Sequence, residues 1–201
     1  MLTMDAVLEV YRAREFALWE VGQEPPSDRL LALSGELSLP QVGTALAVLV
    51  QYNRVEAHSA AELLPRLAAE ECLVAPGGLR LHDARSGTTI VPGCCCGLEE
   101  WREWARLGER EMPWMGHDPD PDGEFGATTV SLWPDEGRRT APAVVPFTRL
   151  RGLLEKVRSD LTGFMWLAGE WSERQVPGTG AALRQKLDEA FHLSAPFSRA
   201  R

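Results

Sequence analysis

The most regular hydrophobic pattern of the chain lies near its end. Apolar residues recur every three or four positions from Phe147 to Trp171, a spacing that places them on one face of an α-helix. The pattern therefore predicts one long amphipathic helix. Three glycines inside it each cost the helix some stability: Gly152, Gly163 and Gly169. A break at residues 175–178 precedes a last predicted helix over residues 181–191.

The first 72 residues carry mainly helical signals. Apolar positions cluster within residues 3–21 as in a helix that is buried on a wide face, with Thr3 as its N-cap. Glycine and two prolines follow this segment and end it. Residues 27–35 are then predicted to form a short helix. We therefore expect a helical subregion over residues 1–72.

Two further helices in this region are predicted from capping boxes. Ser38 is followed three residues later by Gln41, and the apolar stripe after it ends near Asn53. Ser59 begins a second box of the same kind. Pro65 lies inside that second pattern and removes a backbone donor, so we expect the helix to be kinked or to start later than the box suggests.

The signals change to those of strands after Gly77. Residues 79–91 alternate around a turn and predict a hairpin, residues 112–116 a short strand, and residues 127–133 a strand that Pro134 stops. The Pro, Gly and Asp content of residues 118–126 predicts a loop. Between these lies a helix predicted over residues 98–107.

Helices beside a small, mostly antiparallel sheet predict the α+β class. At 201 residues, with 44% hydrophobic and 25% charged positions, the chain has the size and composition of one folded domain. We expect a single domain over residues 1–201, in which residues 73–201 form the sheet-containing subregion.

Charge and cysteine usage narrow the classes of partner. The net charge of −8 argues against binding to nucleic acid or to an anionic membrane, since either requires a basic face. No apolar run approaches the roughly 20 residues of a membrane span, and the first residues lack the pattern of a secretory signal. Three of the four cysteines are adjacent, which does not fit a disulfide framework. We therefore expect reduced thiols and a cytoplasmic protein.

The adjacent cysteines form the first candidate site. Cys94 and Cys96 can bind one metal ion if folding brings in His117 or His82, although a standard zinc site has four ligands in two spaced pairs. The alternative is that these small thiols pack beneath the start of the following helix. Trp101 and Trp104 at helical spacing are expected to belong to the core.

A phosphate-binding loop is a weaker interpretation of the same turn. Cys96 and Arg102 have the Cys-x5-Arg spacing of thiol phosphatases, in which loop amides and arginine bind phosphate. Glu99 and Glu100 lie inside this loop and would repel a phosphate dianion. The pattern therefore does not favour phosphatase chemistry.

The second candidate site is an acidic surface. Eleven acidic residues and only three arginines lie between Glu99 and Glu136, and such a face steers the association of a basic partner. The alternative is an ordinary solvated surface, and residues 118–123 also resemble half of a calcium loop without its final glutamate. The residues that we expect to face the partner are Glu99, Glu100, Glu103, Asp118, Asp120 and Asp122.

Two segments give the chain a family resemblance. Leu39-Pro40 followed by an amphipathic helix to Tyr52-Asn53 resembles the opening of the SUKH superfamily of bacterial immunity proteins. Val-Ser-Leu-Trp-Pro-Asp-Glu at residues 130–136, with Val-Pro-Phe at 145–147 entering a helix, resembles its later part. Arg54 stands where the family has glycine, and the cysteine turn is no part of the family's pattern. That turn is similar to a Gly-Cys-Cys-Cys-Gly-Leu-Glu segment of uncharacterised actinobacterial proteins, which implies no activity.

These observations lead to two hypotheses of different class. The leading one is a non-enzymatic protein-binding protein without a cofactor; the SUKH resemblance implies that it neutralises a basic toxin. The alternative is a thiol- or zinc-dependent protein centred on the turn from Cys94 to Cys96, with His117. We assign no catalytic residue, because the four histidines are isolated and no nucleophile or nucleotide motif is present. The oligomeric state stays open.

Overall fold

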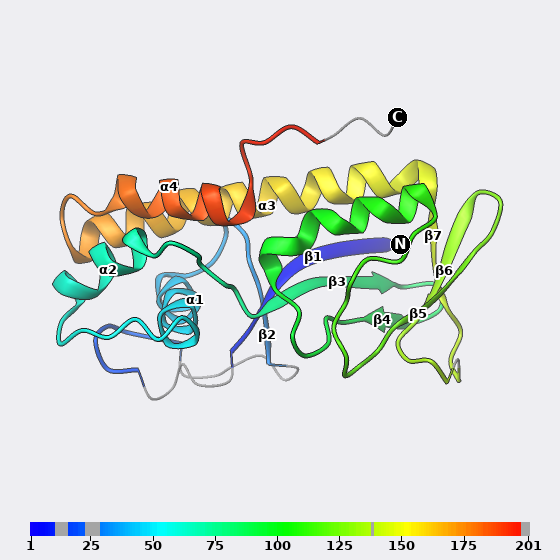
Figure 1. Cartoon of the computed structure of the whole chain (residues 1–201), viewed down its shortest axis with the longest axis horizontal. Coiled ribbons are helices and arrows are strands. Elements are labelled where there is room, and N and C mark those ends of the chain that lie inside the picture. Colours follow the sequence, from blue (N-terminus) through cyan, green and yellow to red (C-terminus); the bar gives the residue numbers. More distant parts are fainter. Residues whose placement is uncertain (11–15, 23–28, 138, 198–201) are drawn as a thin grey trace.

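Strand β1 lies at the centre of the larger of two sheets. The computed structural model describes residues 1–10, 16–22, 29–137 and 139–197. Within them a four-stranded antiparallel sheet has the order β2-β1-β3-β4 (Figure 1). Its strands are β1 (Leu2–Glu9), β2 (Leu30–Ala32), β3 (Gly77–Asp83) and β4 (Thr88–Ile90). The hairpin predicted over residues 79–91 is thus confirmed as β3 and β4.

The helix predicted over residues 3–21 is wrong. Residues 2–9 form β1, and Thr3, the expected N-cap, pairs with His82 of β3. Met4, Ala6 and Leu8 are buried at every second position, as in a strand with one face on the core, and Val7 between them is buried as well. Residues 11–15 of this prediction lie outside the described residues. Pairing with β3 along seven positions supplies the backbone hydrogen bonds that a helix would otherwise form.

The short helix predicted over residues 27–35 is also wrong in its described part. Residues 30–32 pair with β1 as β2, with Leu31 opposite Leu8. Residues 27 and 28 lie outside the described residues. The first 72 residues therefore contain strands as well as helices.

The second sheet is a three-stranded antiparallel meander, β5-β6-β7. Its strands are β5 (Asp122–Phe125), β6 (Thr129–Trp133) and β7 (Ala143–Pro146). The strand predicted over residues 127–133 is confirmed as β6, whereas part of the predicted loop 118–126 is β5. Residues 112–116 form no strand.

A buried carboxylate connects the two sheets. Asp83, at the end of β3, is 1% exposed, and its Oδ2 accepts a hydrogen bond from the backbone N–H of Val144 in β7 at 3.4 Å. Its Oδ1 accepts the N–H of Arg85 at 3.0 Å. The Thr88 hydroxyl also donates to the carbonyl of Ala141 at 2.5 Å. The bond to Val144 joins the β3–β4 hairpin to the second sheet, and the bond to Ala141 joins it to the segment that leads into β7.

Both helices predicted from capping boxes are confirmed. Helix α1 (Leu39–Tyr52) has its box at Ser38, whose N–H donates to the Gln41 carboxamide at 2.9 Å. Helix α2 (Ala60–Ala69) begins at its box rather than later, and contains Pro65 within it. Residues 42–50 of α1 are all buried, so α1 is a core helix.

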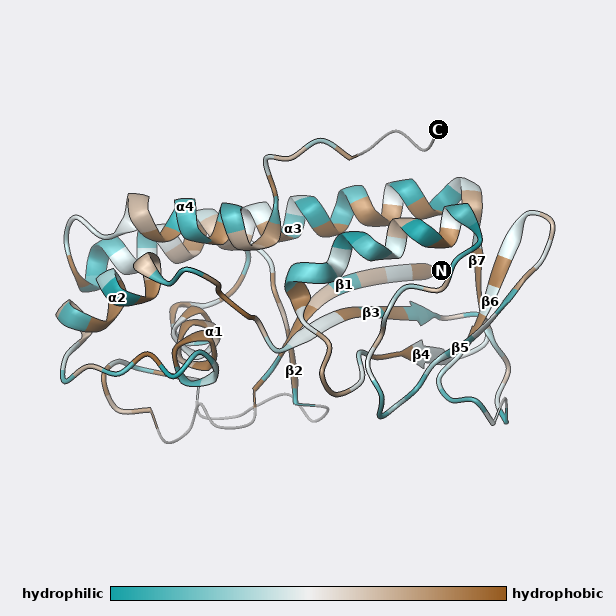
Figure 2. Cartoon of the chain, in the orientation of Figure 1, coloured by the Kyte–Doolittle hydropathy of each residue, from teal (hydrophilic) through white to brown (hydrophobic). Residues whose placement is uncertain are grey.

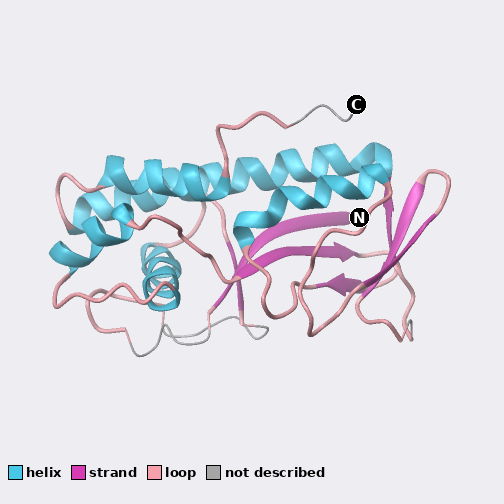
Figure 3. Cartoon of the chain, in the orientation of Figure 1, coloured by secondary structure: helices cyan, strands magenta, loops and turns pink. Residues whose placement is uncertain are grey.

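The long helix α3 (Phe147–Gln175) is confirmed and spans most of the molecule. Helix α4 (Gly180–Phe191) returns along one half of it, while the other half lies over the larger sheet (Figure 1). Figure 3 shows α1, α2 and α4 gathered toward one end of α3 and the strands toward the other. Figure 2 shows the apolar stripes of these helices alternating with polar ones, as amphipathic helices on a core require.

The helix predicted over residues 98–107 is a 3₁₀ helix, η2 (Leu98–Glu109). Its buried residues stand at every third position: Leu98, Trp101, Trp104 and Leu107. A 3₁₀ helix has three residues per turn, so this spacing gives one straight apolar stripe. In an α-helix, with about 3.6 residues per turn, the first and last of these residues would lie on opposite faces. The placement of both tryptophans in the core is confirmed.

The chain is therefore an α+β protein with antiparallel sheets, as predicted. The buried apolar residues of all these elements form one continuous cluster. In the described part of the chain, none of the helices combines the length and the apolar character needed to cross a membrane.

Candidate functional site

The cysteine turn lies against the segment that carries His117. The N–H of His117 donates to the carbonyl of Cys94 at 3.1 Å, and the N–H of Cys94 donates to the carbonyl of Asp118 at 3.2 Å. A third bond runs from the N–H of Gly93 to the carbonyl of Met115 at 2.7 Å. Two segments more than 20 positions apart in the sequence are thus held side by side by their backbones.

Glycine is required where these two segments touch. A β-carbon on Gly93 would lie 2.4 Å from the carbonyl oxygen of Pro119, and one on Gly116 would lie 2.4 Å from the carbonyl carbon of Gly93. Gly116 also has φ of +94°, a conformation that side chains disfavour. The approach of the cysteine turn to His117 therefore depends on two residues without side chains.

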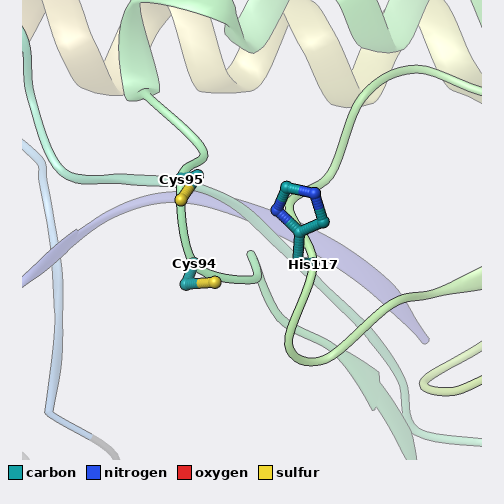
Figure 4. Close-up of side chains that lie close together, drawn as sticks. All are labelled: Cys94, Cys95 and His117. Carbon is teal, nitrogen blue, oxygen red and sulfur yellow. The ribbon is translucent and has the colours of Figure 1, made fainter.

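Three metal-ligating side chains come together at this contact. The Sγ atoms of Cys94 and Cys95 and a ring nitrogen of His117 all lie within 4.8 Å of one another, and all three residues are exposed. Figure 4 shows the Cys94 sulfur directed toward the His117 side of the site. Cys95 has φ of 64°, and this left-handed conformation turns the chain so that two successive thiols share one side. Two sulfurs at about 2.3 Å from one tetrahedral zinc ion lie about 3.8 Å apart, so rotation of the side chains is enough to close the site.

The predicted ligand set is changed by one residue. Cys94 and His117 are brought together as expected, but their neighbour in the cluster is Cys95 and not Cys96. The Cys96 sulfur packs against β3, where a β-carbon on Gly78 would lie 3.2 Å from it. His82, the other histidine considered, lies on β3 with its Nδ1 2.9 Å from the Thr89 hydroxyl.

Trp114 completes the site on its exposed side. Its indole N–H donates to the carbonyl of Cys95 at 3.3 Å, and its ring meets the His117 ring edge to face with centroids 4.7 Å apart. The side chain is nevertheless 46% exposed. Trp114 therefore orients both halves of the cluster while presenting a large apolar surface to solvent.

The surroundings of Cys95 and Cys96 raise the pKa of both thiols. The pKa of the Cys95 thiol is raised mainly by its hydrogen bond with Cys94. Smaller contributions come from the charge of Cys94, from burial and from the charge of Glu9. Burial, together with the charges of Glu100, Glu99 and Glu9, raises the pKa of Cys96 to about 11. A nucleophilic cysteine needs a lowered pKa. The surroundings therefore oppose thiolate catalysis by Cys95 and Cys96, and the negative charge of Glu9 beside Cys95 attracts a cation.

The phosphate-loop interpretation is not supported by the position of Arg102. Its guanidinium donates to three carbonyls of the segment after α4, those of His192 at 2.8 Å, Ala195 at 3.2 Å and Pro196 at 2.7 Å. Arg102 thus fastens the C-terminal segment to η2, and it is not directed at Cys96.

The acidic residues of η2 have different surroundings. Glu99 is half-buried and its Oε2 accepts the backbone N–H of Ala75 at 3.0 Å, so it helps to hold the start of the helix. Glu100 is exposed. Glu103 is exposed and accepts from Arg106 at 3.1 Å.

The acidic residues of the second segment follow His117 directly. Asp118 and Asp120 are exposed, and Asp118 lies beside the cluster through its backbone bond to Cys94. Asp122 is half-buried in β5, where its carboxylate accepts the N–H of Gly123 at 2.7 Å. Of the six expected partner-facing residues, Glu100, Glu103, Asp118 and Asp120 are thus exposed.

Sequence reasoning did not find Cys95 or Trp114 as members of the site. The three adjacent cysteines were the visible signal, but the choice among them depends on the backbone conformation of the turn. Comparison of the chain with protein-family models, curated proteins and solved structures finds no match.

Proposed function

We propose that this protein binds a thiophilic metal ion, with zinc as the representative, through Cys94, Cys95 and His117. The observation that carries the proposal is the gathering of two thiols and an imidazole within 4.8 Å. Thiolate and imidazole ligands select zinc and copper(I) over magnesium or calcium. The negative charge of Glu9, which acts on the Cys95 thiol, favours a cation at the same place.

The position of the cluster indicates an exchangeable rather than a structural ion. Structural zinc sites are closed by four protein ligands, whereas sites with three protein ligands keep a position open. This cluster supplies three exposed ligands, so a water molecule or a donor from another molecule takes the fourth position. The proposal includes a cytoplasmic location, where the reducing environment keeps exposed thiols available as ligands.

The test is a zinc titration of the purified chain in competition with a chromophoric chelator. We expect one equivalent of Zn²⁺ to bind. Mutation of a residue that only hydrogen-bonds to a metal ligand already lowers metal affinity by about 10- to 100-fold. Cys94→Ser and His117→Ala remove a ligand itself, so each is expected to lower zinc affinity by at least about 100-fold. A parallel titration with copper(I) distinguishes the two metals.

Two matched controls use the cysteines outside the cluster. Cys72 is exposed and Cys96 lies next to the site, and Cys72→Ser and Cys96→Ser are each expected to keep the binding stoichiometry. Equal affinities in Cys94→Ser and Cys72→Ser, or no stoichiometric binding of either metal, would contradict the proposal.

A second candidate function is supported by the exposure of Trp114 next to acidic residues. Tryptophan is enriched among the residues that dominate protein interfaces, and the Trp114 ring contacts His117, which the exposed Asp118 follows in the chain. We propose as this alternative that the face binds a basic protein, in the SUKH-like form a toxin that it neutralises. Trp114→Ala and the reversal Glu100→Lys would each weaken capture of that partner, whereas reversal of the distant Glu155 would not.

A further inference from the structure

A cleft separate from the cysteine cluster opens at the helical end of the molecule. It has a volume of about 720 Å³ and lies between the C-terminal end of α1, the connection to α2, and residues 16–18. Sites for small organic ligands typically occupy about 300–1,000 Å³. The cleft shares no lining residue with the cysteine site.

One wall of this cleft is apolar. Phe16 and Leu18 face the end of α1, and Val55 and Leu63 are buried residues of the connection and of α2. Such a wall accepts an aromatic or aliphatic body of the kind that dominates small-molecule sites.

One residue that lines the cleft carries an unused hydrogen-bond acceptor. The Oε1 of Gln51, a lining residue at the end of α1, is buried and has no hydrogen-bond partner among the described residues. Buried polar atoms in folded proteins nearly always have a partner. An N–H or O–H group inside the cleft would supply the missing donor.

Two arginines and one carboxylate line the cleft, although the whole chain carries −8. Arg54 and Arg66 both line it, with His58, and Glu56 is the one carboxylate among its lining residues. The Arg66 Nη1 donates to the Glu56 carbonyl at 2.5 Å, which holds this guanidinium at the rim. The same two arginines line an adjoining hollow of about 430 Å³ that also includes Glu70. Guanidinium groups pair well with carboxylate, sulfonate and phosphate groups.

We propose that this cleft binds a small organic anion that has an apolar body and an N–H or O–H donor. The body lies against Phe16 and Leu18, the donor reaches Gln51 Oε1, and the anionic group lies between Arg54 and Arg66. Each of the three ligand features corresponds to one group of lining residues.

The probe for the test is 8-anilinonaphthalene-1-sulfonate, which combines an aromatic body, an N–H donor and a sulfonate. We expect its fluorescence to rise to saturation at one equivalent of the full chain. Arg54→Asn combined with Arg66→Ala is expected to weaken binding at least tenfold, and Gln51→Met several-fold. Asn suits position 54 because φ there is +55°. Arg151→Ala is the control, since Arg151 is exposed on α3 and pairs with Glu155 at 2.8 Å.

An uncharged analogue separates anion binding from general hydrophobic adsorption. N-Phenyl-1-naphthylamine keeps the aromatic body and the N–H but lacks the sulfonate. We expect this analogue to bind more weakly than the sulfonate probe, with an affinity that the arginine substitutions leave unchanged. Circular dichroism and thermal unfolding of each variant establish that it is folded. Fluorescence that rises without saturation, or an affinity for the sulfonate probe that the arginine substitutions leave unchanged in a folded variant, would overturn the proposal.

Discussion

Gly93 and Gly116 meet backbone to backbone, and this contact sets the distance between the cysteine turn and His117. A β-carbon on Gly116 would lie 2.4 Å from the carbonyl carbon of Gly93, and real β-carbons do not approach other atoms so closely. The metal-ligand cluster therefore rests on two residues that carry no functional group of their own.

Gly93→Ala is accordingly expected to lower both stability and zinc affinity. The added methyl group would meet the Pro119 carbonyl oxygen at 2.4 Å, and overpacking of this kind costs about 1–3 kcal/mol. Moving the two segments apart would also separate Cys94 from His117. Chemical denaturation and the zinc titration measure the two effects. A variant with wild-type zinc affinity would show that the glycine contact does not position the ligands.

The glycines of α3 are expected to respond differently to alanine. Gly152 is exposed with open space around it, so Gly152→Ala should stabilise the protein by about 0.5–1 kcal/mol through helix propensity. A β-carbon on Gly163 would lie 2.9 Å from the backbone nitrogen of Gly35, so Gly163→Ala should destabilise it. Thermal unfolding compares the two. Equal effects would mean that the close packing of α3 on residues 34–35 is not rigid.

The carboxylate of Asp83 is expected to make the stability of the protein depend on pH in the acidic range. Burial alone would raise the pKa of Asp83. Hydrogen bonds from the N–H groups of Arg85 and Val144, together with the Arg85 guanidinium, outweigh burial and lower the pKa of Asp83 below its ordinary value of 3.8. Its contribution is therefore present above pH 3.8 and is lost as the pH falls further, through the lowered pKa of the folded protein.

Asp83→Asn tests this relationship. At neutral pH the variant should be less stable by about 1–3 kcal/mol, since buried hydrogen bonds to a charged group are lost. The difference between variant and wild type should persist from pH 7 to about pH 4 and shrink below it. Urea unfolding at several pH values measures it, with the exposed Asp120→Asn as control. A difference that grows as the pH falls would contradict the lowered pKa.

Trp114→Ala is expected to weaken zinc binding without removing a ligand. The indole donates to the Cys95 carbonyl and packs against the His117 ring, and an aromatic contact of this kind contributes about 0.5–1.5 kcal/mol. The affinity should therefore fall by up to about tenfold. Trp166→Ala is the matched control, because Trp166 is also exposed but lies on α3. Equal zinc affinities in the two variants would exclude an orienting role for Trp114.

The rate of alkylation is expected to differ between Cys96 and the other thiols. The pKa of Cys96 is about 11 against an ordinary value of 9.0, so the thiolate fraction at pH 8 is about 100-fold lower than for an ordinary cysteine. Iodoacetamide followed by tandem mass spectrometry should show Cys72 modified first and Cys96 last. Early modification of Cys96 would mean that its thiol is neither buried nor influenced by Glu99 and Glu100.

The elements that the sequence determined are those encoded over short distances. Apolar residues at helical spacing from Phe147 onward predicted α3. Residues three and four positions apart share one face of a helix, and this relationship does not depend on the rest of the chain. The capping box at Ser38 fixed the start of α1 in the same local way. Val130 and Leu132 alternate with polar residues and marked β6.

Strand β1 was missed because its local pattern fits both structures. Val7 interrupts the alternation of Met4, Ala6 and Leu8, so the segment has an apolar face as a helix and as a strand. Its seven pairs with β3, about 75 positions away, decide between them. Partners at that distance leave no trace in the local periodicity.

The candidate site divides in the same way. The sequence by itself determined that thiols and acidic residues concentrate between Cys94 and Asp122, and it named Cys94 and His117 as partners. Only the tertiary structure decided that Cys95 completes the cluster, because a left-handed turn at Cys95 and the glycine contact that docks residue 117 set the direction of each side chain. Side-chain direction at an irregular turn depends on backbone dihedrals that non-local packing fixes, and the order of residue types does not specify them.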